Sequence, residues 1–66
     1  MAMTSITTEE DLRDWLIELL DDAAAERDIP LRIDTFAEAG VLTRNEGIVL
    51  RFPGGEEFQI TIVKRR

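Results

Sequence analysis

The chain contains no cysteine, no histidine and no tyrosine among its 66 residues. Without cysteine it cannot be cross-linked by disulfides, and without cysteine or histidine it lacks the ligands of the usual zinc sites. The same absences remove the commonest general bases and nucleophiles of enzymes. We therefore expect a protein that is not an enzyme and that holds neither a metal nor a cofactor.

Long apolar segments are also missing. No stretch of the sequence approaches the roughly 18–20 apolar residues that a membrane span requires. Residues 1–5 lack the basic start and the apolar segment of a secretory signal. We expect a cytoplasmic protein that makes no contact with a membrane.

The short chain limits the size of the core. A domain of this length buries only about 60% of the surface that its unfolded form exposes. Small domains without disulfides or metals gain stability from efficient packing or from oligomerisation. Because 44% of the residues are hydrophobic and 33% are charged, the composition is typical of one folded domain over residues 1–66.

The segment 7–28 has the pattern of an amphipathic helix. Thr7 with Glu10 has the spacing of a capping box, and Thr8 with Asp11 is an alternative register. Apolar residues then recur at intervals of three and four, which defines one helical face. The members of this stripe are Leu12, Trp15, Leu16, Leu19, Leu20 and Ala23.

The pattern changes at Pro30, because the residue before a proline is driven out of the helical conformation. Residues 31–63 alternate between apolar and polar side chains, as in an antiparallel β meander. Residues 37–43 fit either a helical turn closed by Gly40 or a bulged continuation of the first strand. Residues 1–6 are expected to form a mobile arm. The three strands are expected at residues 31–36, 47–52 and 57–63.

The register of the last hairpin follows from the alternation of its side chains. Glycines at positions 54–55 suit the positive φ angles of a tight turn. Only a loop with an odd number of residues keeps both apolar rows on the same face. A five-residue loop pairs Phe52 with Phe58, whereas a three-residue loop places Arg51 opposite Glu57. We favour the three-residue loop because it sets opposite charges across from each other.

These elements predict an α+β domain in the order α-β-β-β. One N-terminal amphipathic helix packs on one face of a small three-stranded antiparallel sheet, which gives a single two-layer core. The helix is expected to contribute Trp15, Leu16 and Leu19 to this core. The sheet is expected to contribute Ile48, Leu50, Phe58, Ile60 and Ile62.

Acidic residues are concentrated in the helical half. Residues 1–30 hold nine acidic and two basic side chains, whereas residues 31–66 hold five and six. Like charges four residues apart destabilise a helix by roughly 0.2–0.5 kcal/mol per pair. The acidic face is therefore either a solvated surface or a docking surface for a basic partner. Its candidate binding residues are Glu10, Asp11, Asp14, Glu18, Asp21 and Asp22.

The size and acidity of the chain resemble those of small inhibitor proteins from phage and other mobile elements, a likeness of composition alone. This resemblance implies an acidic inhibitor that imitates a nucleic acid and blocks a nucleic-acid-binding protein through the helix face. Direct binding of nucleic acid is not expected, because the net charge is −6 and such binding requires a basic surface.

A second candidate surface is apolar. The far face of a three-stranded sheet would be left uncovered by the helix, and an apolar patch there would suit a protein partner. Ile17 lies off the apolar stripe of the helix and is expected to be exposed as well. The candidate interface residues are Ile17, Phe36, Val49 and Val63. The leading hypothesis is a small non-catalytic protein–protein interaction module that forms a homodimer.

Overall fold

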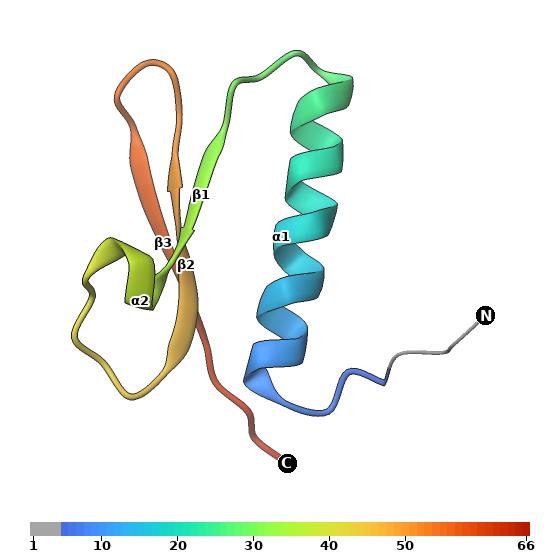
Figure 1. Ribbon diagram of the computed structural model, residues 1–66, viewed down its shortest axis with the longest axis vertical. Helices are drawn as coiled ribbons and strands as arrows, with labels where there is room; N and C mark the ends of the chain where they lie inside the picture. Colours follow the sequence, from blue (N-terminus) through green and yellow to red (C-terminus); the bar gives the residue numbers. More distant parts are fainter. Residues whose placement is uncertain (1–4) are drawn as a thin grey trace.

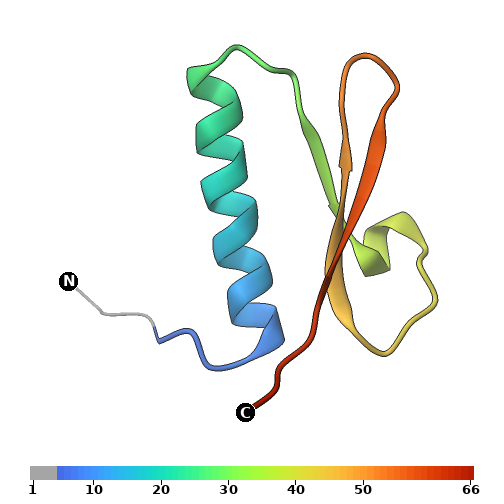
Figure 2. The same ribbon diagram turned by 180° about the vertical axis from the view of Figure 1, so that it is seen from behind.

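The computed structural model describes residues 5–66, so the first four residues of the expected mobile arm lie outside it. Two helices and three strands form an α+β domain, with the strands in the order β1-β2-β3 and antiparallel throughout. Helix α1 lies on one side of the sheet and the short helix α2 on the other (Figures 1 and 2). The elements are α1 (Glu9–Glu26), β1 (Arg32–Thr35), α2 (Phe36–Ala39), β2 (Glu46–Arg51) and β3 (Glu57–Ile62). The predicted fold class, a helix on a three-stranded antiparallel sheet, is confirmed.

Helix α1 begins with the second of the two capping registers. The Thr8 hydroxyl accepts a hydrogen bond from the Asp11 N–H at 3.0 Å, and the Asp11 carboxylate accepts from the Thr8 N–H at 3.1 Å. The same carboxylate accepts from the N–H of Thr7 at 3.2 Å. Asp11 thereby satisfies two backbone donors that precede the first helical turn. The helix ends at Arg27, whose N–H donates to the Ala24 carbonyl at 3.1 Å.

The ambiguous segment after β1 is a helical turn. The Thr35 hydroxyl accepts from the Glu38 N–H at 3.2 Å, and the Glu38 carboxylate accepts from the Thr35 N–H at 2.8 Å. Gly40 closes the turn with a φ of 76°, a left-handed conformation that glycine adopts without steric cost. This second capping box reverses the chain at the end of β1.

The two capping carboxylates make the stability of the fold depend on pH. Hydrogen bonds from the backbone of Thr7 and Thr8 lower the pKa of Asp11 below its ordinary value of 3.8, and the backbone of Thr35 lowers the pKa of Glu38 below 4.5. A carboxyl whose pKa is lower in the folded state adds stability above its unfolded pKa and loses it as the pH falls.

We expect the free energy of unfolding to decline as the pH falls through 4.5 and then 3.8. The double variant Asp11→Asn, Glu38→Gln should show a shallower decline, because its caps no longer titrate. Urea unfolding at a series of pH values measures both slopes. Glu10→Gln is the control, since Glu10 takes no part in either capping box. Equal slopes for the double variant and the unmodified protein would contradict the assignment.

The β2–β3 hairpin has the predicted register. Arg51 lies opposite Glu57, and the Arg51 Nε donates to the Glu57 carboxylate at 3.0 Å. The Phe52 N–H donates to the Glu56 carbonyl at 2.9 Å, which leaves residues 53–55 as the loop. Gly55 has a φ of 96°, the conformation that a three-residue hairpin loop requires at its last position.

The rotation of α1 differs from the prediction. Trp15 and Leu19, expected in the core, are 48% and 46% exposed. Ala24 is buried, and Leu16, Ile17 and Leu20 are half-buried. The buried stripe is thus shifted by about one residue from the apolar stripe of the sequence, which is about 100° around an α-helix.

An ion pair at the start of α1 is consistent with this rotation. The Arg13 guanidinium lies 2.8 Å from the Glu46 carboxylate on β2, with only 18% of the Arg13 side chain exposed. Glu46 points to the same sheet face as Ile48 and Leu50, because side chains alternate along a strand. Arg13 is therefore held on the sheet side of the helix, and Trp15 is turned away from the sheet centre.

The far face of the sheet is covered. Phe36 and Val49, expected on an open surface, are each only 3% exposed. Helix α2 contacts β1 and β2 on this face, and the Phe36 ring lies where a Cβ at Gly47 would be. Phe36 does leave the strand on the predicted side, but the turn of α2 folds its ring onto the sheet. The prediction that this face is open is wrong.

Candidate functional site

Large apolar side chains are exposed on both α1 and β3. On the strand side, Phe58 is 55% exposed and Ile60 is 36% exposed. They pair with Leu50 and Ile48 of β2, so they point to the sheet face on which α1 lies. Since β3 is at the edge of the sheet, the helix leaves these two side chains incompletely covered.

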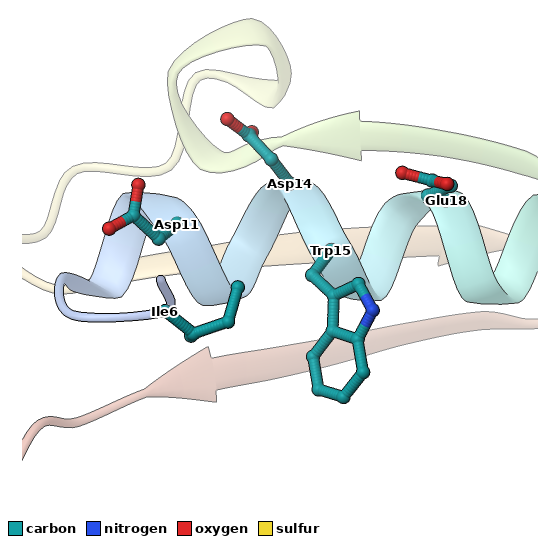
Figure 3. Close-up of a pocket in the computed structure, with 5 residues that line it drawn as sticks. All are labelled: Ile6, Asp11, Asp14, Trp15 and Glu18. Atoms are coloured by element: carbon teal, nitrogen blue, oxygen red, sulfur yellow. The ribbon is translucent and has the colours of Figure 1, made fainter. Parts of the chain in front are cut away.

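On the helix side, the exposed side chains are Trp15 and Leu19, which follow each other by one helical turn. Figure 3 shows the Trp15 indole directed to the β3 side of α1. Arg13 contacts Glu46, and Glu46 lies opposite Ile62 of β3. The rise of a helix is 1.5 Å per residue and that of a strand about 3.3 Å. On this scale Trp15 lies between the levels of Ile62 and Ile60, and Leu19 lies between those of Ile60 and Phe58. We call Trp15, Leu19, Phe58 and Ile60 the α1–β3 groove.

The apolar surface continues beyond the groove at the C-terminal end of α1. The Phe52 ring packs edge-on against Phe58, with 5.6 Å between the ring centroids. Phe52 also borders a second hollow beneath the last turns of the helix. That hollow is lined by Leu20, Ala23, Ala24, Arg27, Ile29, Leu31 and Phe52.

Carboxylates occupy the opposite flank of α1. A hollow at the helix N-terminal half is lined by Ile6, Asp11, Asp14, Trp15 and Glu18. In Figure 3 its three carboxylates lie on the β1 side of the helix, whereas Ile6 and Trp15 lie on the β3 side. In the N-terminal half of α1, the carboxylates of this hollow and its apolar side chains thus lie on different flanks of the helix.

The structure leaves most of the predicted acidic face exposed. Asp11 is the exception, because it is half-buried and its carboxylate accepts hydrogen bonds in the cap of α1. Asp14 lies 2.9 Å from the Arg13 guanidinium. The exposed members are Glu10, Asp14, Glu18, Asp21 and Asp22.

The predicted apolar interface is not assembled. Phe36, the first residue of α2, and Val49 of β2 are buried, and Ile17 is half-buried within the stripe that faces the sheet. Val63 alone of the four is largely exposed, at 65%. These residues do not form one exposed surface, because α2 covers the part of this face that is formed by β1 and β2.

Sequence reasoning missed the α1–β3 groove because it assigned all four of its residues to the core. A signal was nevertheless present. The helix stripe and the strand rows together contain more large apolar side chains than one helix can cover on three strands, so some had to remain exposed.

The outer edge of β3 is a further feature of the site. Phe52 and Glu56 form a hydrogen-bonded pair at the head of the hairpin. Since such pairs alternate along an antiparallel ladder, the backbone groups of Glu57, Gln59 and Thr61 point away from β2. Within residues 5–66 no strand pairs with this edge.

No helix within residues 5–66 is long and apolar enough to cross a membrane. The same residues contain no group of three or more acidic side chains placed to hold a metal ion. Comparison with models of protein families, with curated proteins and with solved structures found no match.

Proposed function

We propose that this protein is a small non-catalytic protein–protein interaction module that self-associates as a homodimer through the α1–β3 groove. One observation carries the proposal: four large apolar side chains from two neighbouring elements are exposed together. Contiguous apolar surface of this kind marks interaction sites, whereas single exposed apolar residues do not. The absence of histidine, cysteine and tyrosine supports the non-catalytic part of the proposal.

The energy available from the groove is of the right order for association. Burying the exposed half of such a side chain contributes about 1 kcal/mol, so the eight groove side chains of a dimer contribute about 8 kcal/mol. Association costs about 4–15 kcal/mol in lost freedom. The groove can therefore drive a specific contact when further interactions accompany it.

Substitution of Leu19 tests the groove. We expect Leu19→Lys to weaken the dimer at least tenfold, because a charge in the groove must be desolvated on association. Leu42→Lys is the matched control, since Leu42 is fully exposed and follows α2 on the other side of the sheet. Sedimentation equilibrium measures the dissociation constant, and the blue shift of Trp15, the only tryptophan, reports burial of the groove. A monomer at all concentrations would refute the homodimer.

The acidic flank of α1 supports a second candidate, the inhibitor that imitates a nucleic acid. Five of the six predicted binding residues are exposed along this helix, although like charges at this spacing are unfavourable. The variant with Asp14→Lys, Glu18→Lys and Asp21→Lys should then lose a basic partner that the unmodified protein captures from lysate. Such a complex should also weaken steeply with salt, whereas an apolar dimer should not. Retention of the same partner by the triple variant would contradict this candidate.

The cytoplasmic location and the absence of direct nucleic-acid binding remain predictions from composition. The net charge of −6 supports the second of them, because phosphate backbones repel an acidic surface. Both candidates imply that the protein acts by contact with another polypeptide.

A further inference from the structure

We infer that two copies of the chain join along the outer edges of β3, antiparallel, with Ile60 opposite Ile60 of the partner subunit. This inference rests on the proposed homodimer and specifies how it forms. It produces one continuous six-stranded sheet with both α1 helices on the same face.

The backbone of β3 is complementary to itself. Its outward N–H and C=O groups belong to Glu57, Gln59 and Thr61, which are alternate residues on the strand. When two copies of β3 pair antiparallel around a twofold axis, the numbers of any two facing residues add up to the same sum. The outward backbone groups of one copy face those of the other only if this sum is even. The same condition keeps Phe58 and Ile60 on one face in both copies. Backbone and side-chain requirements therefore select the same set of registers.

Charge selects one register from this set. With Ile60 on the axis, Glu56 lies opposite Lys64 of the partner, and Phe58 lies opposite the partner's Ile62. A shift that places Gln59 on the axis sets Glu56 against Ile62. A shift that places Thr61 on the axis sets Phe58 against Lys64. On the α1 face, only the central register sets no apolar side chain opposite a charged one, and on the far face it places Glu57 opposite Val63 of the partner subunit.

The opposite edge of the sheet is less suited to this role. Strand β1 has four residues, whereas β3 has six, and β1 turns directly into α2. Natural sheets protect their edges with short strands, prolines or inward-pointing charges. Strand β3 has none of these devices, because the residues that point to the α1 side are Phe58, Ile60 and Ile62.

The arrangement also completes the groove. Helix α1 contacts both β2 and β3, so two α1 helices related by an axis beside β3 would be about 10–14 Å apart at the strand spacing of about 4.8 Å. Packed helices are separated by 8–10 Å, and large side chains bridge a wider gap. Trp15 lies on the β3 side of α1, which faces the axis, whereas Asp14 and Glu18 lie on the β1 side, away from it (Figure 3).

Single cysteine variants test the register directly, because the natural chain has no cysteine. Residues of a non-hydrogen-bonded antiparallel pair have Cα atoms about 4.5 Å apart, which a disulfide can span. Under mild oxidation, Ile60→Cys should form a disulfide-linked dimer at least tenfold faster than Leu42→Cys, the exposed control. Non-reducing electrophoresis measures the rate.

Neighbouring positions separate the alternatives. Fastest cross-linking by Gln59→Cys or Thr61→Cys would overturn the register and retain the edge pairing. A dimer in sedimentation whose three variants all cross-link no faster than Leu42→Cys would overturn the edge pairing and leave the homodimer intact. A monomer in sedimentation would remove the homodimer itself.

A second pair of variants tests the edge without cysteine. Thr61→Pro removes one outward N–H and leaves the ladder to β2 intact, as proline on an edge strand does. We expect Thr61→Pro to weaken the dimer at least tenfold and Thr61→Ala to leave it unchanged. Circular dichroism verifies that both variants are folded. Equal dimerisation of the two folded variants would overturn the inference.

Discussion

Replacing Gly47 with alanine is expected to reduce the free energy of unfolding by about 3 kcal/mol, the upper end of what overpacking a core costs. A Cβ at this position would overlap the Phe36 ring and the Ile60 carbonyl oxygen. The ring can move only by leaving its place on the sheet, and the carbonyl belongs to the β2–β3 ladder. Because a domain of this size is stable by roughly 3–10 kcal/mol in total, the substitution should remove between about a third and all of that stability.

The control for Gly47→Ala is Gly54→Ala in the hairpin loop. There the nearest atoms to an added Cβ belong to the flexible Glu56 side chain, so we expect a loss below about 1 kcal/mol. Urea unfolding at a fixed protein concentration compares the two variants. Similar stability losses would show that the close approach of Phe36 to Gly47 does not constrain the fold.

Truncating Phe36 is expected to have a comparable effect. Phe36→Ala removes a ring that is only 3% exposed and should cost about 3–5 kcal/mol, as buried phenylalanines generally do. The loss arises on the face of the sheet opposite α1. We therefore expect Phe36→Ala to destabilise the fold without altering the dissociation constant of whatever dimer remains folded.

The double variant Phe36→Ala, Gly47→Ala distinguishes the overlap with the Phe36 ring from the overlap with the Ile60 carbonyl oxygen. If the Phe36 ring were the only obstacle to a Cβ at Gly47, the double variant would be no less stable than Phe36→Ala alone. Because the Ile60 carbonyl oxygen remains, we expect an additional but smaller loss, so that the two effects are less than additive. Fully additive losses in denaturant unfolding would contradict direct contact between these positions.

The parts of the fold that depend on neighbouring residues could be predicted from the sequence. A capping box and apolar residues spaced three and four positions apart predicted α1. Side-chain alternation and the Arg51–Glu57 charge pair predicted the hairpin register. Both rules act within one element or across one turn, so they do not require knowledge of the rest of the molecule.

The candidate site could not be predicted in the same way, because it depends on how separate elements pack. The pattern placed Trp15 in the core, and the Arg13–Glu46 ion pair, which joins residues far apart in the sequence, turned it outward. Likewise, strand alternation placed Phe36 on the correct face but could not show that α2 would fold it inward. Gly47 within an apolar strand was the available hint, since glycine in a strand often marks a close approach.

The Arg13–Glu46 contact also has a bearing on recognition. This ion pair includes none of the groove residues, yet it constrains the rotation of α1 about its axis. It therefore affects which aromatic and aliphatic side chains of α1 are exposed. Without this contact, Trp15 could pack over the strands, and the exposed surface of α1 would then be more polar. The surface that α1 exposes thus depends partly on an ion pair that lies outside that surface.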